Sequence, residues 1–264
     1  MASHRTVKKT AYATGFFVVV IGLVTLVVLP LLPDNTQTRL SDTTSSYVPV
    51  ALENVVVIPH IAKPGPKGKT IDIVARLKNA NPRAGTGSYP IVFTVKDSTN
   101  EVISRFTQDA YVLPGGLQYL VALDVPIPSN TTLGGVDVQP PTAITLTPLP
   151  DNARLPDFSV FLRDRKQVMS GAYPMEQQTG VVTNNSTFDW EKVEVTGVAL
   201  NTNGSIVGVG RTFVGKLLIG EQREFTLQWP FPDDQTVRVV ALASTNIYSD
   251  ANVVHMIGDP GKLR

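Results

Sequence analysis

The chain has 264 residues, a formal net charge of +1 at pH 7 and no cysteine. A nearly neutral chain has no electrostatic reason to bind nucleic acid, and without thiols it has neither disulfides nor thiolate chemistry. Its 20 glycines and 20 prolines, with many valine, isoleucine and threonine residues, favour short strands and tight turns. Each folded domain must therefore bury enough apolar surface to be stable without covalent cross-links.

The first predicted element is a membrane-spanning helix at residues 13–32. This run contains no charged residue, and at 1.5 Å per residue it spans about 30 Å, the thickness of a bilayer's hydrocarbon core. A cleaved signal peptide is the alternative, but its apolar region is about 7–15 residues long and ends at a small-x-small site. The longer run favours an uncleaved anchor, formed by the apolar side chains of Phe16, Phe17, Val20, Leu23, Leu26 and Leu29.

Charge sets the expected orientation of this anchor. Arg5, Lys8 and Lys9 lie in the leader, residues 1–12, which has no acidic residue. Positive flanks stay in the cytoplasm, so the C-terminal part is expected to be extracytoplasmic. The chain is thus interpreted as a single-pass protein of the cell membrane.

A second interpretation of the N-terminus concerns assembly. The sequence Gly15-Phe16-Phe17 after a basic leader is similar to the cleavage point of type IV pilins. Those proteins usually carry glutamate at the fifth mature position, where this chain has Val20. That departure favours the uncleaved anchor over a pilin.

Residues 33–49 are polar, rich in serine and threonine, and without periodicity. Such a composition is typical of a flexible linker, and we expect it to hold the folded part away from the membrane. Folded sequence is predicted to begin near Val50, with a first strand at Leu52–Ile58.

An internal repeat follows. Moving residues 77–128 along by 104 positions superimposes them on residues 181–232 without a gap and with seven identities. The residue types in register are more informative, because turn-forming and apolar positions coincide. The repeat predicts two β domains at residues 50–150 and 151–255, with a tail at 256–264. Its turn signature consists of Asp97, Asn100, Gly116, Asn201, Gly204 and Gly220.

Within the second copy, alternating and apolar runs predict strands separated by turns, and a short helical piece could fit around Tyr173–Gln178. Short antiparallel strands with turns every 8–12 residues are typical of immunoglobulin or fibronectin type III sandwiches. The antibody cysteine pair is absent, which favours the fibronectin-like variant. The predicted strands are Gly180–Thr183, Lys192–Leu200, Ser205–Val214, Glu224–Trp229 and Thr236–Ala243.

Two sets of motifs resemble known families. Phe93-Thr94-Val95-Lys96-Asp97 resembles the signature of FxLYD-type domains. The run from Val182 to Val195, with later runs at 220–230 and 245–252, resembles an uncharacterised family of single-pass envelope proteins from Patescibacteria-type (candidate phyla radiation) bacteria. The resemblance implies a short cytoplasmic start, one anchor and two β domains, and it implies no activity. Many of those relatives carry a cysteine-containing segment after the anchor, which the Ser/Thr-rich stalk replaces here.

We find no pattern that predicts catalysis, a cofactor site or a metal site. His60 lacks a spaced partner and is interpreted as a loop residue at a strand end. Asp233, Asp234, Asp250 and Asp259 do not have the spacing of a calcium loop, so they are interpreted as solvated residues rather than calcium ligands. No nucleophile elbow or phosphate loop is present. The chain is therefore not expected to be an enzyme.

Two surface features have alternative interpretations. The charged run Arg163–Lys166 is expected on a strand edge, where charge opposes aggregation, and a patch for an anionic cell-wall polymer is the alternative. The aromatic residues are expected to pack in the core or between domains, and a carbohydrate platform or protein hot spot is the alternative. These aromatic residues are Phe188, Trp190, Trp229, Phe231 and Tyr248.

These observations predict a mainly β protein with an N-terminal transmembrane helix and two tandem immunoglobulin- or fibronectin-like sandwiches. The expected function is a non-catalytic binding or structural role at the cell envelope, with a subunit of a pilus-like or surface-layer assembly as the alternative. The expected partners are the lipid bilayer, through the helix, and an unknown envelope protein or polymer, with self-association possible and nucleic acid excluded. An exposed strand edge is the simplest binding surface, because it already offers unpaired backbone groups.

Overall fold

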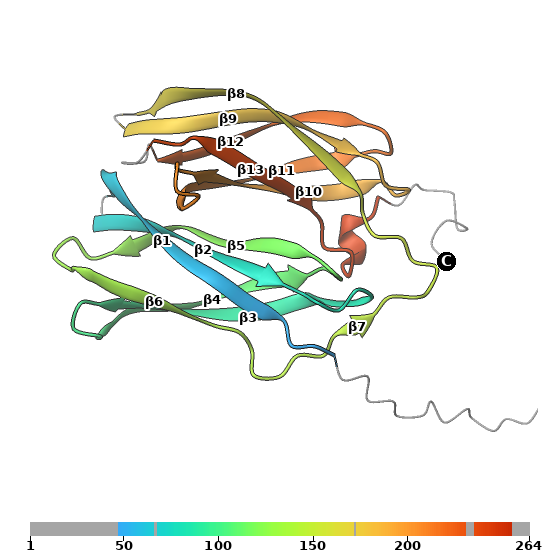
Figure 1. The fold of residues 1–264 in the computed structure, drawn as a ribbon, viewed down its shortest axis with the longest axis horizontal. Coiled ribbons are helices and arrows are strands. Elements are labelled where there is room, and N and C mark those ends of the chain that lie inside the picture. The colour runs from blue at the N-terminus through green and yellow to red at the C-terminus, as the bar shows by residue number, and fades with distance from the viewer. Residues whose placement is uncertain (1–46, 66–67, 172, 231–234, 255–264) are drawn as a thin grey trace, which may run out of the picture. The chain divides into compact units, whose positions relative to one another are not determined.

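The computed structural model describes residues 47–65, 68–171, 173–230 and 235–254 (Figure 1). Three predicted segments lie wholly outside these residues, namely the leader 1–12, the helix 13–32 and the tail 256–264. Most of the predicted stalk 33–49 lies outside them as well. Within the described part, no helix is long and apolar enough to cross a membrane.

The described residues are mainly β. The first half contains β1 (Ala51–Gly65), β2 (Gly68–Lys78), β3 (Ala84–Asp97), β4 (Val102–Val112), β5 (Leu117–Ile127), β6 (Leu133–Gln139) and β7 (Thr147–Pro148). The second contains β8 (Phe158–Ser170), β9 (Tyr173–Asn184), β10 (Trp190–Leu200), β11 (Ile206–Leu217), β12 (Gln222–Pro230), β13 (Arg238–Ser244) and the short 3-10 helix η3 (Asp250–Asn252).

Two local predictions are wrong. The short helix predicted around Tyr173–Gln178 is part of β9, which pairs residue by residue with β12. The reason is burial with a period of two, since Glu176 and Gln178 turn inward while their neighbours are less buried. His60 lies within β1, opposite Thr70 of β2, rather than in a loop.

The two halves share one strand order. In the first half, β1-β2-β5 form one sheet and β4-β3-β6 the other, with β7 added beside β3. In the second half, β8-β9-β12 and β11-β10-β13 repeat this arrangement, and all of these pairs are antiparallel. Each half is thus an immunoglobulin-like β-sandwich of two packed sheets.

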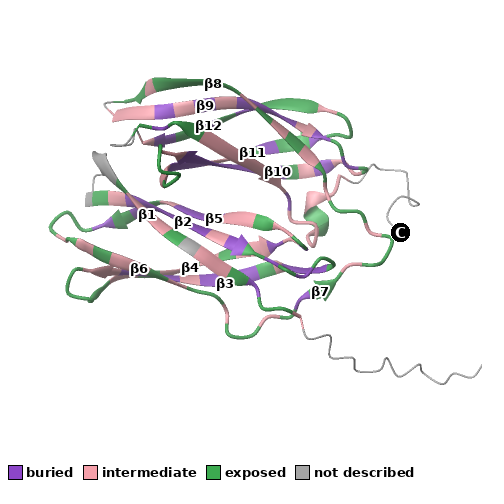
Figure 2. Cartoon of the chain, viewed as in Figure 1, coloured by how far each residue is buried: buried purple, intermediate pink, exposed green. Residues whose placement is uncertain are grey.

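Each sandwich has its own core. In the first half, alternate residues of β2 and β3 meet between the sheets, including Ile73, Leu77, Ile91 and Phe93. In the second half, Val193, Val195, Leu227 and Trp229 do the same. Figure 2 shows buried and more exposed positions alternating along many of the strands. This alternation is what places one face of each strand in the core.

A third apolar cluster joins the two sandwiches. It contains Val74 and Val121 from β2 and β5, and Val198 and Val209 from β10 and β11, all of them buried. The sheets therefore stack in four layers, β4-β3-β6, β1-β2-β5, β11-β10-β13 and β12-β9-β8 (Figure 1). Both inner sheets are covered on two faces.

The repeat is confirmed in its strand order, but the offset differs between strands. Leu117 lies opposite Lys78, and Gln222 lies opposite Thr183, so these strands match at 105 positions rather than 104. Other strands keep the offset of 104 positions. Phe93 lies opposite Phe106 in the first half, and Gly197 lies opposite Gly210 in the second. The loop after β2 is one residue longer in the first half, and the turn before β12 is one residue longer in the second. An ungapped comparison misses such compensating differences.

Candidate functional site

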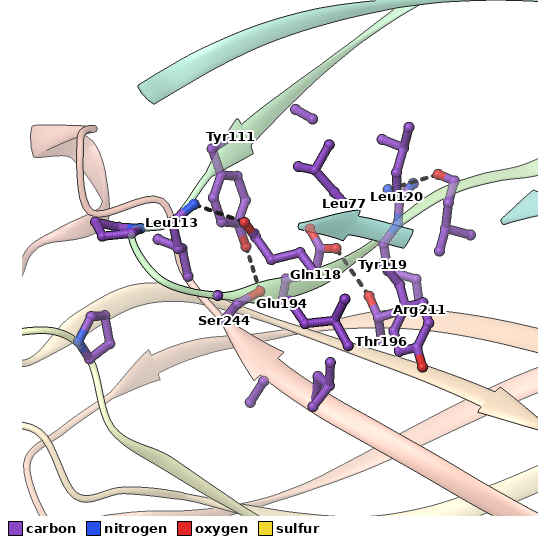
Figure 3. A pocket seen from close by; sticks show the side chains of 18 of the residues that line it. Leu77, Tyr111, Leu113, Gln118, Tyr119, Leu120, Glu194, Thr196, Arg211 and Ser244 are labelled. Atoms are coloured by element: carbon purple, nitrogen blue, oxygen red, sulfur yellow. Dashed lines mark hydrogen bonds between the residues drawn. The ribbon is translucent and has the colours of Figure 1, made fainter. Parts of the chain in front are cut away.

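A cavity of about 240 Å³ lies between the two sandwiches. Its walls come from β2, β4, β5 and the turn that joins the last two in the first half, from the segment before β8, and from β10, β11 and β13 in the second half (Figure 3). Leu77, Leu120 and Leu242 supply apolar surface. The polar side chains that line it are Gln108, Asp109, Tyr111, Gln118, Tyr119, Glu194, Thr196, Arg211 and Ser244.

Strand alternation in β10 explains why polar groups reach this cavity. Val193 and Val195 face the core of the second sandwich, so Glu194 and Thr196 face the opposite side of the sheet. The neighbouring strands bring Arg211 opposite Thr196, and Ser244 opposite Glu194. This outer face of β11-β10-β13 is the one that packs against the first sandwich.

Hydrogen bonds fix the polar walls. The hydroxyls of Tyr111 and Ser244 share a hydrogen bond of 2.7 Å across the two halves. Thr196 Oγ1 donates to Glu194 Oε1 at 3.1 Å, and Arg211 Nη1 donates to the carbonyl oxygen of Val121 at 3.3 Å. Gln118 Oε1 accepts from the backbone N–H of Leu113 at 2.8 Å.

The environment of Tyr111 keeps its hydroxyl protonated. Burial raises the pKa of Tyr111 well above its usual range, and the nearby Glu194 carboxylate raises it further, while Arg211 and the bond to Ser244 lower it. A neutral hydroxyl can both donate and accept a hydrogen bond. The cavity therefore combines a neutral phenol with a carboxylate and a guanidinium.

A second hollow of about 270 Å³ adjoins the cavity and shares Tyr111 and Glu194 with it. Lys192 and Phe213 line its other side, together with Asn246 and Asn252. The Phe213 ring is about half exposed, and Lys192 Nζ lies 4.0 Å from its centroid. The guanidinium carbon of Arg211 lies 5.8 Å from the same centroid, and such cation–aromatic contacts help to hold the ring in place.

The segment after β13 closes one end of this region against the first sandwich. Asn246 Nδ2 donates to the carbonyl oxygen of Gly87 at 2.9 Å, and Tyr248 packs beside Gly85. A Cβ at Gly85 would lie 2.8 Å from Tyr248 Oη and 2.1 Å from the carbonyl oxygen of Val112, so only glycine allows this approach. Tyr248 and Asn246 therefore fix how the two halves meet.

Of the predicted turn residues, Asp97 and Asn201 shape loops rather than the cavity. Asp97 Oδ1 accepts from the backbone N–H groups of Thr99 and Glu101, and Asn201 Oδ1 does the same for Asn203 and Ser205. The hydrogen bond from the Thr99 hydroxyl is the largest cause that lowers the pKa of Asp97.

Backbone angles distinguish the turn positions of the two halves. Asn100 and Gly204 have φ angles of 71° and 77°. Gly220 has a φ of 72°, and its counterpart in the first half is Gly115 with a φ of 60°, not Gly116. Gly116 lines the cavity.

The other residues that the sequence singled out are placed as follows. Trp229 is buried in the second core and donates through Nε1 to Glu176 Oε2 at 2.9 Å, and Trp190 packs against Phe188. The run Arg163–Lys166 lies in β8, at the edge of its sheet, beside a register shift between Leu162 and Arg165. Asp250 lies in η3. The anchor residues, the leader charges, Phe231, Asp233, Asp234 and Asp259 are outside the described residues.

The sequence did not single out the cavity residues Tyr111, Gln118, Arg211 and Ser244. They come from strands far apart in the chain and follow no fixed spacing. Glu194 carried the one usable signal, a charged residue at an alternate position of a strand otherwise rich in valine. Among the described residues, no group of three or more histidine, aspartate or glutamate side chains could hold a metal ion.

Comparisons with known proteins add little. No protein-family model matches the sequence, and no curated protein matches it. Among solved structures, the chain is similar to a transglutaminase from red sea bream, with 12% identity over 74% of this chain and a TM-score of 0.22. The chain spans 28% of that enzyme's length, and a TM-score this low carries no argument about fold or function.

Proposed function

We propose that this chain is a membrane-anchored extracytoplasmic protein with a non-catalytic binding or structural role at the cell envelope. In this proposal, residues 13–32 anchor the chain in the bilayer, and Arg5, Lys8 and Lys9 keep the leader in the cytoplasm. The two sandwiches act as tandem immunoglobulin- or fibronectin-like domains outside the membrane. The motifs shared with the Patescibacteria-type envelope family support the same architecture.

The observation that carries a binding role is the position of β8 at the edge of its sheet among the described strands. This strand of 13 residues pairs with β9 and ends the sheet β12-β9-β8. Phe161 on β8 is 68% exposed, and Met169 is also exposed. An edge strand offers unpaired backbone groups, and exposed apolar side chains beside it offer contacts for a partner strand.

The regular part of this edge is short. The register shift after Leu162 bends β8 where Arg163 and Asp164 follow. Arg163 is already paired with Glu224, and Arg165 with Glu176. We therefore assign the partner strand to the stretch Phe158–Leu162, which includes Phe161. The bulge and the charged run oppose pairing of the whole strand with a second copy, which weighs against the assembly alternative.

Crosslinking with mass spectrometry on intact cells tests this function. The tagged full chain is expected to crosslink repeatedly to one other envelope protein or polymer, and Phe161→Ser is expected to reduce that product several-fold. Val102→Ser is the matched control, because Val102 is 58% exposed on β4, another edge strand. Crosslinks between copies of the chain alone would favour the assembly subunit instead.

A separate experiment tests the location. Protease added to intact cells is expected to remove the β-rich part and leave the leader protected. The N-terminus of the membrane-bound chain is expected to be intact. Cleavage between Gly15 and Phe16 would support a pilin-like assembly and contradict the anchor.

A further inference from the structure

The cavity between the sandwiches has hydrogen-bonding capacity that its own residues do not use. Within the described part of the chain, Glu194 accepts from Thr196 through Oε1, which leaves Oε2 available. Gln118 accepts through Oε1, which leaves its amide N–H groups available, and Arg211 uses one of its five N–H donors. These groups come from both halves and line the same space (Figure 3). Convergent polar groups in a preformed cavity are the usual mark of a ligand site.

Charges across the two hollows balance. Glu194 and Arg211 line the cavity, and Lys192 lines the adjoining hollow. Asp109 is the remaining carboxylate, and its Oδ1 already accepts from Ser88 Oγ and from the backbone N–H of Tyr89, both at 2.9 Å. An anionic ligand would lie close to the carboxylates, and a cationic ligand would lie close to Arg211 and Lys192. A neutral molecule whose groups both donate and accept avoids this cost, and hydroxyl groups have that property.

The size and lining of the cavity restrict the class of ligand further. A cavity of about 240 Å³ equals roughly eight water molecules at about 30 Å³ each, which suits one small ring rather than a drug-sized ligand. Tyr111 and Tyr119 line the cavity, and the half-exposed Phe213 lines the adjoining hollow. Aromatic rings provide flat apolar faces next to polar groups.

We infer that this site binds a neutral glycan, with one sugar ring in the cavity and the next ring against Phe213. In the cavity, sugar hydroxyls donate to the free oxygen of Glu194 and accept from Arg211 and Gln118. Tyr111 and Glu194 lie on the boundary between the two hollows and contact both rings. The site uses no residue of β8, so it is independent of the strand-edge function proposed above.

Titration calorimetry on the full chain in a mild detergent tests the inference. The probes are cellotetraose, maltotetraose and tetra-N-acetylchitotetraose, with tetragalacturonate and glutamine as the anionic and zwitterionic comparisons. At least one neutral tetrasaccharide is expected to bind. Glu194→Gln and Arg211→Gln are each expected to weaken binding by about tenfold, the effect of losing a hydrogen bond to a charged group.

Glu224→Gln is the matched control, because Glu224 is an ion-paired, exposed glutamate on β12. It is expected to leave binding unchanged, as is Phe161→Ser. Gln118→Ala replaces any variant that fails to fold. Bound glycan is expected to slow hydrogen exchange within residues 108–121 and 192–196. The inference is overturned by no binding of any neutral probe, by tighter binding of glutamine or tetragalacturonate, or by protection confined to other strands.

Discussion

Two buried asparagines hold the same place in the two sandwiches. Asn79 Nδ2 donates to the carbonyl oxygens of Ala84 and Leu113 at 2.7 and 2.9 Å. Asn184 Nδ2 donates to those of Phe188 and Leu217 at 2.8 and 3.1 Å. In each half the asparagine therefore ties the loop after the second strand to the end of the fourth. In both places a buried side-chain amide thus supplies hydrogen bonds to two backbone carbonyl oxygens.

Replacing Asn184 by alanine is expected to lower the free energy of unfolding by about 3 kcal/mol, because two buried carbonyl oxygens lose their donor. Denaturation by urea measures this change. Asn185→Ala is the matched control, since Asn185 is exposed and its side-chain amide donates to Ser159 Oγ, and about 0.5 kcal/mol is expected there. Equal losses in the two variants would show that Asn184 does not carry this role.

Removing the hydroxyl group is expected to change the stability of the protein differently at two tyrosines. Tyr89 is fully buried, and its hydroxyl has no hydrogen-bond partner among the described residues. Tyr89→Phe is therefore expected to leave the free energy of unfolding unchanged or raise it by up to about 1 kcal/mol, whereas Tyr111→Phe loses the bond to Ser244 and about 1 kcal/mol. Thermal unfolding checks both variants, and a loss at Tyr89 equal to that at Tyr111 would contradict the first expectation.

At the scale of elements, the hairpin turn between β10 and β11 depends on a left-handed residue. Gly204 has a φ of 77°, and a Cβ there would meet open space, so any cost of substitution is in the backbone. The matching turn of the first half uses Asn100 with a φ of 71°. Gly204→Ala is expected to cost about 1 kcal/mol, and Gly204→Asn less, because asparagine tolerates this conformation. Urea denaturation of the two variants checks the order, which would be wrong if alanine were the milder change.

Strands with alternating apolar and polar residues could be predicted from the sequence. The residue-by-residue alignment of the two halves could be predicted only in part. Lys192–Leu200 and Glu224–Trp229 lie in β10 and β12 as expected, because one face of each is regularly apolar. The constant offset paired Val121 with Phe225, but the ladders match Phe225 with Leu120. A shift of one residue moves a side chain to the other face of its strand. Val121 therefore packs between the sandwiches while Phe225 packs in a core.

At the scale of the whole molecule, the sandwiches do not behave as separate units. The sequence predicted two β domains of similar strand content, and nothing in it indicated that Val74 and Val198 face each other across a third apolar cluster. The cavity depends on this packing, because its walls belong to both halves. Residues such as Tyr111 and Ser244 meet only when sheets more than a hundred positions apart in the chain come together. Neither the cluster nor the cavity follows from local patterns.

This shared packing predicts one unfolding transition for both halves. Residues 46–258, without the predicted anchor, are expected to be soluble and to unfold cooperatively in scanning calorimetry. Val209 is fully buried in the cluster between the halves. Val209→Asp would bury an unpaired carboxylate there, so the fragment is expected to lose about 3 kcal/mol or more, and its transition is expected to separate into two.

The exposed Val237 is the control, and Val237→Asp is expected to leave the single transition in place. Two transitions in the unsubstituted fragment, both insensitive to Val209→Asp, would show that the sandwiches fold independently. In that case the cavity would open and close with the motion of the halves, and glycan binding would be weak even with every lining residue intact. A single transition that Val209→Asp divides would instead show that packing between the inner sheets holds the cavity in its binding geometry. The four valines of the third apolar cluster would then stabilise both the contact between the sandwiches and the cavity.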